Sequence, residues 1–199
     1  MKLYLIRHGQ SEGNVRNLWY GLNDLPLTEL GRQQAMQVSE KIRDIPLAKA
    51  YVSPLQRARV TAELALRYHD IPQIIVPDLQ EQDMGELETL SVEEIGRRDP
   101  VYLKTIQNDW VHVTPTGGEP YDTGLAPRVA KVLDSIVAAG EDCAIVAHNG
   151  PLRYAVTYLL GLPIDAVRQF YLNQGFYTVI EIDPSIRNAT HSMLRRFNA

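Results

Sequence analysis

The stretch "LYLIRHGQSEGN", residues 3–14, changes abruptly from apolar to polar. Its first four residues form a short apolar run of the kind that predicts a buried strand. Arg7 and His8 follow directly, and Gly9 and small polar residues come after them. The boundary raises the question of what a cationic pair does at the end of a buried strand. The ends of the other predicted strands help to answer it.

The composition is that of an ordinary globular protein. The chain has 199 residues, of which 45% are hydrophobic and 22% charged, and this suits one domain with its own core. Its net charge of −4 provides no basic field for a nucleic acid, so an anion would have to be held by local arginines. Cys143 is the only cysteine, which excludes an intrachain disulfide and fits a reducing cytoplasm. No apolar run approaches the roughly 20 residues of a membrane helix, so we expect a cytoplasmic protein without a membrane or nucleic-acid partner.

Apolar runs and helical patterns alternate along the chain. Strands are predicted at residues 2–6, 50–52, 74–76 and 143–147, and two further runs, 176–182 and 191–197, predict edge strands. Helices are predicted from Thr28, from Pro54, from Ser91, over 100–110, over 128–139 and over 151–160. This order predicts an α/β fold, a three-layer α/β/α sandwich with a mostly parallel central sheet, in a single domain spanning residues 1–199.

Polar and charged residues follow each of the four predicted parallel strands. Ligands of such sheets bind beyond the carboxyl ends of the strands, so we expect these side chains to share one rim. In chain order they are Arg7, His8, Arg57, Glu81, His148 and Asn149.

These residue types suit metal-free phosphoryl transfer. Arginine forks bind phosphate oxygens, and a histidine that titrates near neutral pH can act as a nucleophile. A carboxyl group beside a phosphate dianion is favoured in its protonated form and can donate its proton to a leaving oxygen. A metal site is disfavoured because no HxH or HExxH spacing occurs, and Arg7 beside His8 would repel a cation.

Each of these residues alone has an ordinary structural interpretation. A lone "RHG" is common, Arg57 alone could be a solvated helix residue, and a histidine at a strand end is usually structural. That structural interpretation is adopted for His69, His112 and His191. The functional interpretation depends on the joint occurrence at four strand ends.

Six segments in order resemble the sequence blocks of the histidine phosphatase superfamily, the phosphoglycerate mutase-like family. They are "LIRHGQSEGN" (5–14), "LPLTELGRQQA" (25–35), "VSPLQRARVTA" (52–62), "LQEQDMGELE" (79–88), "PTGGEP" (115–120) and "AIVAHNGPLR" (144–153). The resemblance extends from residue 3 to about residue 183. It implies the phosphoglycerate mutase-like fold and an enzyme that needs neither a metal nor another cofactor.

The resemblance also implies a role for individual residues. His8 matches the nucleophile that becomes phosphohistidine, with one ring nitrogen free and the other held by a neighbour such as a backbone carbonyl. Glu81 matches the proton donor that later activates water, and Gly9 is expected to let phosphate approach the backbone. His148 is expected to be protonated and to neutralise phosphate oxygens together with the arginines. The residues implied to bind phosphate or substrate are Arg7, Asn14, Gly21, Arg57, His148 and Asn149.

The sequence departs from the family pattern just after the implied acid. Leu87 stands where an aromatic residue is frequent, and Glu88 and Thr89 stand where many members have a glycine. These surroundings leave open that Asp83 or Glu86 shares the role of the acid.

A second departure lies further along the chain. Residues of about 82–127 are expected to form a cap-like insertion over the active site. Within it Pro120 replaces a serine that usually caps a helix, and Pro127 follows downstream, so the shape of the cap is left open.

The main functional prediction is a phosphomonoesterase that acts on a small phosphorylated metabolite. The first alternative is a cofactor-dependent phosphoglycerate mutase, an isomerase. Mutases of this family carry a longer insertion with paired arginines. Arg97 and Arg98 occur here, but without the rest of that pattern, and they are interpreted as a solvated helix end.

The second alternative is a non-catalytic phospholigand-binding module, which ranks last because His8 and Glu81 are both present. Aromatic residues that could form walls of the pocket, or belong to its rim or core, are Trp19, Tyr20, Tyr102 and Trp110. The sequence selects neither a particular metabolite nor an oligomeric state.

Overall fold

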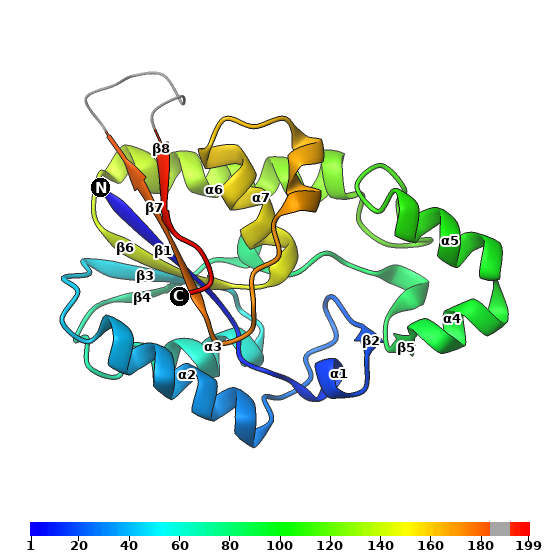
Figure 1. Cartoon of the computed structure of the whole chain (residues 1–199), viewed down its shortest axis with the longest axis horizontal. Helices are drawn as coiled ribbons and strands as arrows, with labels where there is room; N and C mark the ends of the chain where they lie inside the picture. Colours follow the sequence, from blue (N-terminus) through cyan, green and yellow to red (C-terminus); the bar gives the residue numbers. More distant parts are fainter. Residues whose placement is uncertain (184–191) are drawn as a thin grey trace.

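A six-stranded sheet forms the middle layer of the molecule (Figure 1). The computed structural model describes residues 1–183 and 192–199. The strands lie in the order β4 (Gln73–Ile75), β3 (Lys49–Val52), β6 (Cys143–Ala147), β1 (Lys2–Arg7), β7 (Tyr177–Ile182) and β8 (Ser192–Arg196). Neighbours run parallel from β4 to β1, and β7 is antiparallel to both β1 and β8. The predicted mostly parallel sheet is therefore confirmed.

The pairing of the three central strands aligns their carboxyl ends. Arg7 of β1 is opposite Ala147 of β6, and Val52 of β3 is opposite Val146. The residues that follow these positions therefore emerge together on one rim of the sheet.

The prediction that residues 176–182 form an edge strand is wrong. β7 lies between β1 and β8, and its side chains are buried at all positions except Glu181, as an inner strand requires. The edges are β4 and β8, and Ile74 and Ile75 of β4 are 41% and 49% exposed. His191, the predicted first residue of the last strand, lies outside the described residues.

Helices cover both faces of the sheet (Figure 1). The helices α2 (Glu29–Ile42) and α3 (Gln56–Ala65) lie on one face, and α6 (Ala126–Ala139) and α7 (Asn149–Leu159) lie on the other. Side chains of β1 alternate between the two layers, because Leu3 and Leu5 belong to one hydrophobic cluster and Tyr4 and Ile6 to the other. This confirms the three-layer arrangement.

The helix ends follow the signals in the sequence. Thr28 caps α2 by accepting the N–H of Gly31 at 3.1 Å, and Gly140 ends α6 with a left-handed φ of 70°. Pro127 lies in the first turn of α6, where a missing N–H costs no hydrogen bond. A π-helical turn, η3 (Tyr121–Leu125), precedes α6 directly.

The smaller elements lie mostly between residues 12 and 108. They are α1 (Glu12–Val15), β2 (Leu18–Trp19), β5 (Leu90–Ser91), α4 (Val92–Arg98), α5 (Pro100–Asn108) and the 3-10 turns η1 (Pro77–Leu79), η2 (Gly85–Leu87) and η4 (Ile164–Gln169). β2 and β5 pair as a separate two-stranded ribbon. The predicted capping box of α4 is confirmed, because Ser91 and Glu94 exchange side-chain-to-backbone hydrogen bonds.

The helices α4 and α5 project from one end of the molecule (Figure 1). They enclose a small core of their own, made by Leu87, Ile95 and Ile106. Arg97 and Arg98 occupy the last turn of α4, and Arg97 faces Glu93 across an exposed ion pair of 3.6 Å. Their interpretation as a solvated helix end is confirmed.

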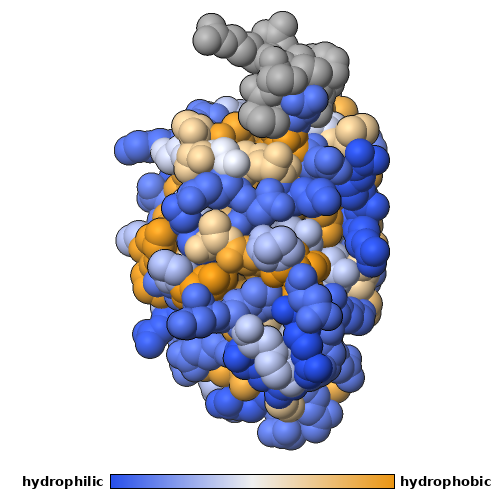
Figure 2. All heavy atoms as spheres, turned by 90° about the vertical axis from the view of Figure 1, so that its left-hand side faces the viewer, coloured by the Kyte–Doolittle hydropathy of each residue, from blue (hydrophilic) through white to orange (hydrophobic). Residues whose placement is uncertain are grey.

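The face that lies opposite α4 and α5 is largely hydrophilic, with apolar side chains between the polar ones (Figure 2). Across the described ranges, no helix combines the length and the apolar character that a membrane span requires.

Candidate active site

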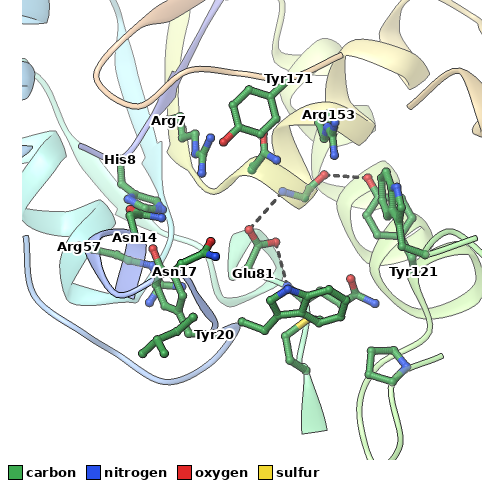
Figure 3. A pocket seen from close by; sticks show the side chains of 18 of the residues that line it. Arg7, His8, Asn14, Asn17, Tyr20, Arg57, Glu81, Tyr121, Arg153 and Tyr171 are labelled. Carbon is green, nitrogen blue, oxygen red and sulfur yellow. Dashed lines mark hydrogen bonds between the residues drawn. The ribbon is translucent and has the colours of Figure 1, made fainter. Parts of the chain in front are cut away.

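A cavity of about 380 Å³ opens at the predicted rim of the sheet (Figure 3). Six of the predicted site residues line it, and Gly21 and His148 are not among its lining residues. The six are Arg7, His8, Asn14, Arg57, Glu81 and Asn149.

His8 follows the last residue of β1, and its side chain is held in one tautomer. The ring is nearly inaccessible, with 3% of the residue exposed, and Nδ1 lies 2.7 Å from the carbonyl oxygen of Gly9. Burial, followed by the charges of Arg57 and Arg7, lowers the pKa of His8 well below its ordinary value. The imidazole is therefore neutral near pH 7, with Nδ1–H donating to Gly9 and the lone pair of Nε2 free, as expected of a nucleophile.

Gly9 has a packing reason to be glycine in addition to the expected approach of phosphate to its backbone, which stays a prediction. A Cβ atom at Gly9 would lie 2.2 Å from the carbonyl oxygen of Gly31, and Gly9 is not a lining residue of the cavity. Glycine is needed here because the first strand end packs directly against the start of α2.

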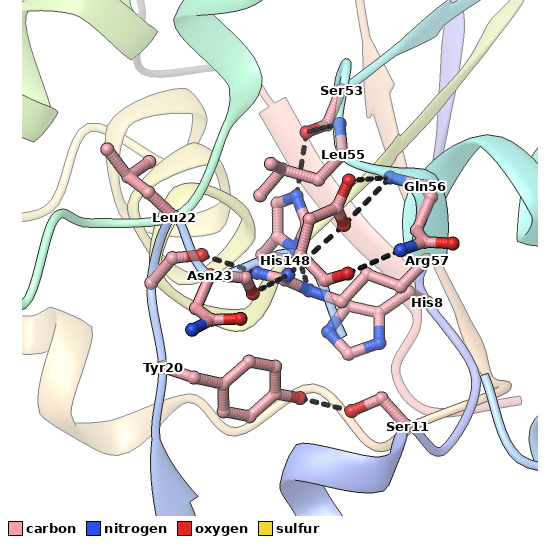
Figure 4. Close-up of polar contacts among 12 residues, drawn as sticks. His8, Ser11, Tyr20, Leu22, Asn23, Ser53, Leu55, Gln56, Arg57 and His148 are labelled. Atoms are coloured by element: carbon pink, nitrogen blue, oxygen red, sulfur yellow. Dashed lines mark hydrogen bonds and ion pairs between the residues drawn. The ribbon is translucent and has the colours of Figure 1, made fainter. Parts of the chain in front are cut away.

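Arg57 is the most constrained cation of the site (Figure 4). Only 1% of the residue is exposed, and its Nη1 and Nη2 donate to the carbonyls of Asn23 and Gly21 at 2.9 and 2.6 Å. Its guanidinium carbon lies 4.8 Å from the centre of the Tyr20 ring, and Asp24 is 3.7 Å away. These contacts fix the plane of the guanidinium before any ligand binds.

The loop of residues 21–23 is itself held by one carboxylate. Oε1 of Glu88 accepts the N–H groups of Gly21 and Leu22 at 2.8 and 2.9 Å, and Oε2 accepts that of Asn23 at 3.2 Å. The carbonyl of Gly21 supports Arg57, and Gly21 is not a lining residue of the cavity. Its lack of a side chain is required because a Cβ atom would lie 1.7 Å from the carbonyl oxygen of Gln82.

His148 is completely buried behind the cavity. Its Nε2 lies 2.7 Å from Oγ of Ser53, and its Nδ1 accepts a hydrogen bond from Nε of Arg57 at 3.2 Å. Burial and then the charge of Arg57 lower the pKa of His148 well below its ordinary value. The expectation of a protonated His148 is therefore wrong in this structure, because the ring nitrogen that faces Arg57 serves as an acceptor.

Arg7 and the two asparagines present donors toward the cavity. Nη1 of Arg7 donates to the carbonyl of Leu172 at 2.6 Å, whereas its Nε is buried without a hydrogen-bond partner in the described chain. The amide oxygen of Asn14 accepts from the N–H and hydroxyl of Ser11 at 3.0 and 2.9 Å, so its NH₂ group remains available. Asn149 is the first residue of α7, and its Oδ1 accepts the N–H of Leu172 at 3.3 Å.

Glu81 contributes the one carboxylate among the described residues that line the cavity. Its Oε2 accepts the N–H of Gly150 at 3.2 Å, and its Oε1 accepts the N–H of Gln82 at 3.0 Å (Figure 3). Asp83 instead accepts the N–H of Gly85 at 2.8 Å, and Glu86 is exposed. Neither of them lines the cavity, so the geometry favours Glu81 as the acid.

The segment that carries Glu81 is anchored by Arg128 on α6. Nη1 of Arg128 donates to the carbonyls of Asp78 and Gln80 at 2.7 and 2.9 Å, and Nη2 donates to that of Glu81 at 3.1 Å. Glu119 completes the anchor through a 2.7 Å ion pair with Nε of Arg128. These contacts hold the loop that carries Glu81.

Aromatic side chains form much of the remaining wall. Trp19, Tyr20 and Trp110 line the cavity, as considered from the sequence, whereas the hydroxyl of Tyr102 accepts the N–H of Thr116 outside it. Lining residues that sequence reasoning missed include Asn17, Tyr121, Arg153 and Tyr171. Arg153 lies four residues after Asn149 on α7 and so shares its face, but the helix predicted over 151–160 did not include Asn149.

The other histidines have ordinary surroundings. His112 is exposed and lies 3.2 Å from Asp122 and 3.3 Å from Asp165, contacts that raise its pKa, with the Asp122 hydrogen bond the largest cause. Nε2 of His69 lies 3.0 Å from the carbonyl oxygen of Ile45. Within the ranges that the structure describes, no three His, Cys, Asp or Glu side chains are grouped as metal ligands.

The fold and this cavity define a class of enzyme that transfers phosphate through a histidine. Comparison with known proteins agrees: the family model described as the histidine phosphatase superfamily (branch 1) matches residues 3–191. The chain therefore belongs to this superfamily, and it is a phosphomonoesterase with the phosphoglycerate mutase-like fold, as the sequence predicted.

Individual relatives span both activities found in the family. The adenosylcobalamin/alpha-ribazole phosphatase of Salmonella typhimurium is 35% identical over 185 residues, which cover 92% of this chain and 91% of that protein. The crystal structure of the alpha-ribazole phosphatase of Shigella flexneri has a TM-score of 0.90 and 30% identity, covering 100% of this chain and 96% of that one. The probable phosphoglycerate mutase GpmB of Erwinia tasmaniensis is 30% identical, covering 86% of this chain and 80% of that protein.

Proposed function

We propose that this protein hydrolyses small phosphate monoesters without a metal, through a phosphohistidine formed on His8. One observation carries the proposal: a neutral His8, held by Gly9 so that Nε2 is free, shares a cavity with Glu81. A nucleophile and a proton donor on one cavity are the two groups that the reaction needs.

In the first step, Nε2 of His8 attacks phosphorus in line with the ester oxygen. The P–O ester bond breaks as the N–P bond forms, and protonated Glu81 donates its proton to the leaving oxygen. Arg7 and Arg57 hold the equatorial oxygens together with the NH₂ group of Asn14, and they stabilise the charge that spreads over these oxygens in the transition state.

In the second step, the carboxylate of Glu81 takes a proton from a water molecule. The resulting hydroxide attacks phosphorus, the N–P bond breaks, and inorganic phosphate leaves with His8 and Glu81 restored. His148 acts behind the cavity: its Nδ1 accepts from Nε of Arg57, which keeps that guanidinium in place.

The size and walls of the cavity support a small organic phosphate as the substrate. The curated relative from Salmonella typhimurium is named for alpha-ribazole phosphate hydrolysis, so esters of that kind belong in the first screen. We also propose that residues of about 82–127 cap the site, a role supported by the contribution of Met84, Ile106, Trp110 and Pro115 to the cavity wall.

The test is a phosphate-release assay in the presence of EDTA. The panel holds alpha-ribazole phosphate, sugar phosphates, and 3-phosphoglycerate with and without 2,3-bisphosphoglycerate. We expect metal-independent release of phosphate from one or a few of these monoesters. Appearance of 2-phosphoglycerate only with the bisphosphate primer, and no phosphate release, would instead identify a mutase.

The role of His8 is tested by replacing it. His8→Ala should abolish phosphate release and the acid-labile phosphoenzyme, whereas His112→Ala, which changes an exposed histidine outside the cavity, should leave both intact. Turnover retained in the His8 variant would overturn the phosphohistidine mechanism.

A further inference from the structure

Arg153 lies on the wall of the cavity but outside the phosphate-binding group of residues. It belongs to the second turn of α7, one turn after Asn149. Its Nε donates to the carbonyl of Phe170, and its guanidinium carbon lies 5.0 Å from the ring centre of Trp110 and 5.4 Å from that of Tyr171. The backbone carbonyl and the two rings fix the plane of the guanidinium.

Unlike Arg128 and Arg168, Arg153 has no anionic partner among the described residues, a property that it shares with Arg7 on the other side of the Tyr171 ring. Arg128 pairs with Glu119, and Arg168 pairs with Asp109 and Asp165. Arg153 has no ion pair with any described residue, and its Nη1 and Nη2 make no hydrogen bond there. Burial is the largest cause that lowers the pKa of Arg153 from its ordinary value, which reflects the cost of moving a cation away from water.

The position of Arg153 relative to Glu81 indicates which side of the cavity holds the leaving alcohol. In Figure 3, His8 and Arg57 lie on one side of Glu81, and Arg153 and Tyr121 lie on the other. Because Glu81 protonates the leaving oxygen, the phosphate occupies the first side. The alcohol that leaves must extend toward the second side.

We propose that Arg153, framed by Trp110 and Tyr171, is a second anion subsite that binds a carboxylate or phosphoryl group on the leaving alcohol. The inference rests on the proposed phosphatase function. A planar fork with two free nitrogens binds such groups bidentately, and a substrate that carries one supplies the missing counter-charge. The preferred substrates are therefore monoesters with a second anionic group remote from the scissile bond.

The test compares matched substrate pairs that differ in this second anion. The pairs are 4-carboxyphenyl and 4-carbamoylphenyl phosphate, 3-phosphoglycerate and glycerol 3-phosphate, and fructose 1,6-bisphosphate and fructose 6-phosphate. The first two pairs present a carboxylate and the third a phosphoryl group, so they distinguish the two sources of the anion. The quantity measured is kcat/KM for each member, with wild type and with Arg153→Gln.

Wild type should prefer the anionic member of at least one pair, and Arg153→Gln should reduce that preference by about 10- to 100-fold, mainly through KM. This is the range expected for loss of one charge-assisted hydrogen-bonded contact. Arg153→Lys should restore part of the preference because it returns the charge without the fork. A general disturbance of the site would lower kcat/KM equally for both members of each pair. Its effect therefore cancels in the ratio of the two kcat/KM values.

Arg168→Gln is the matched control. Arg168 also lies near Trp110, at 5.9 Å from its ring centre, but it is paired with Asp109 and does not line the cavity. Its replacement should leave every preference unchanged. Equal losses on both members of all pairs in Arg153→Gln, or no anion preference in wild type, would overturn the subsite. Turnover of the esters that lack a second anionic group would still support the phosphatase function. No turnover of any compound would overturn both proposals.

Discussion

At the scale of single residues, the site depends on two buried histidines that stay neutral. His8 and His148 are fully enclosed, their ring centres are 5.2 Å apart, and two arginines lie beside them. Protonating either ring would place another cation among these charges without solvent to stabilise it. The same condition that leaves Nε2 of His8 free for the proposed attack therefore makes the folded state sensitive to acid.

We expect the free energy of unfolding to fall as the pH is lowered from about 7 to 5. The pKa values of His8 and His148 are lowered by folding, so the unfolded chain binds more protons below the ordinary histidine pKa of about 6.5. The contribution of the two neutral histidines to the free energy of unfolding is fully present above that pH. Below it, this contribution falls by up to about 1.4 kcal/mol per pH unit for each histidine. Urea denaturation over this range measures the slope.

Two variants check the origin of that slope. His8→Asn should make it shallower, since one of the two titrating rings is gone. His112→Asn should leave the slope below about pH 6.5 nearly unchanged, because the ring is protonated there in both the folded and the unfolded chain. The raised pKa of His112 stabilises the fold fully below that pH, and this contribution is lost only as the pH rises through the raised pKa. An unchanged slope in His8→Asn would show that the acid sensitivity arises elsewhere.

The backbone of Gly150 holds the carboxylate of Glu81, the proposed acid. Its N–H donates to Glu81, and a Cβ atom there would lie 2.3 Å from Oε1 of the same carboxylate. In Gly150→Ala the flexible Glu81 side chain should move aside, so the fold should survive while kcat falls about 10- to 100-fold, a part of what general acid–base catalysis contributes. Phosphate-release kinetics and thermal unfolding measure the two effects, and unchanged kcat would contradict the assigned role of Glu81.

At the scale of elements, the loop of residues 21–23 connects Glu88 with Arg57 through backbone hydrogen bonds. The carboxylate of Glu88 accepts four backbone N–H groups. Three belong to the loop, and the fourth is that of Met84, which donates to Oε1 at 3.1 Å. The carbonyls of the same loop then fix Arg57. The departure from the family pattern at Glu88 and Thr89 therefore lies at a supporting position, and the left-handed φ of 67° at Thr89 explains why a glycine suits that place.

Glu88→Gln should weaken phosphate binding although the residue does not line the cavity. The new NH₂ group must face N–H donors, which costs about 1–3 kcal/mol of stability and frees the loop behind Arg57. We expect KM to rise roughly 10-fold and the inhibition constant of inorganic phosphate to rise with it. Steady-state kinetics with phosphate as inhibitor measures both.

Glu86→Gln is the matched control for that experiment, because Glu86 is an exposed glutamate two residues away. It should behave as wild type. A stability loss in Glu88→Gln with an unchanged phosphate inhibition constant would show that Glu88 supports the fold without positioning Arg57.

The sequence predicted the rim well because parallel strands place their ends together. Arg7, His8 and Arg57 follow strands whose periodicity was clear, so topology alone brought them into one cavity. Strand order has no such local signal, and β7 was misplaced at an edge although its nearly continuous apolar residues are typical of an inner strand.

The site residues and supporting roles that the sequence did not predict depend on tertiary contacts. Tyr171 reaches the cavity from the segment between η4 and β7, where no motif marks it. The hydrogen bonds of Glu88 to a loop more than sixty residues earlier, and the acceptor role of His148 toward Arg57, depend on packing that periodicity does not encode.

At the scale of the whole molecule, the cavity joins distant parts of the chain. Its lining residues extend from Arg7 to Tyr171, and they come from strand ends, from α7 and from the region of α4 and α5. A ligand that binds there is released when the chain unfolds globally. Binding should therefore be visible as added stability of the entire fold.

Orthovanadate, which resembles the transition state of phosphoryl transfer, should raise the unfolding temperature. At a concentration of about 100 times its Kd, a ligand that binds only the folded state adds roughly 2.7 kcal/mol, which for a domain of this size corresponds to about 5–10 °C. Differential scanning calorimetry measures the shift, with sodium chloride at equal ionic strength as the control. A shift no larger than that of chloride would show that the arginines and Asn14 do not form an oxyanion site, because a preformed cradle of fixed donors must favour the oxyanion over a simple counter-ion.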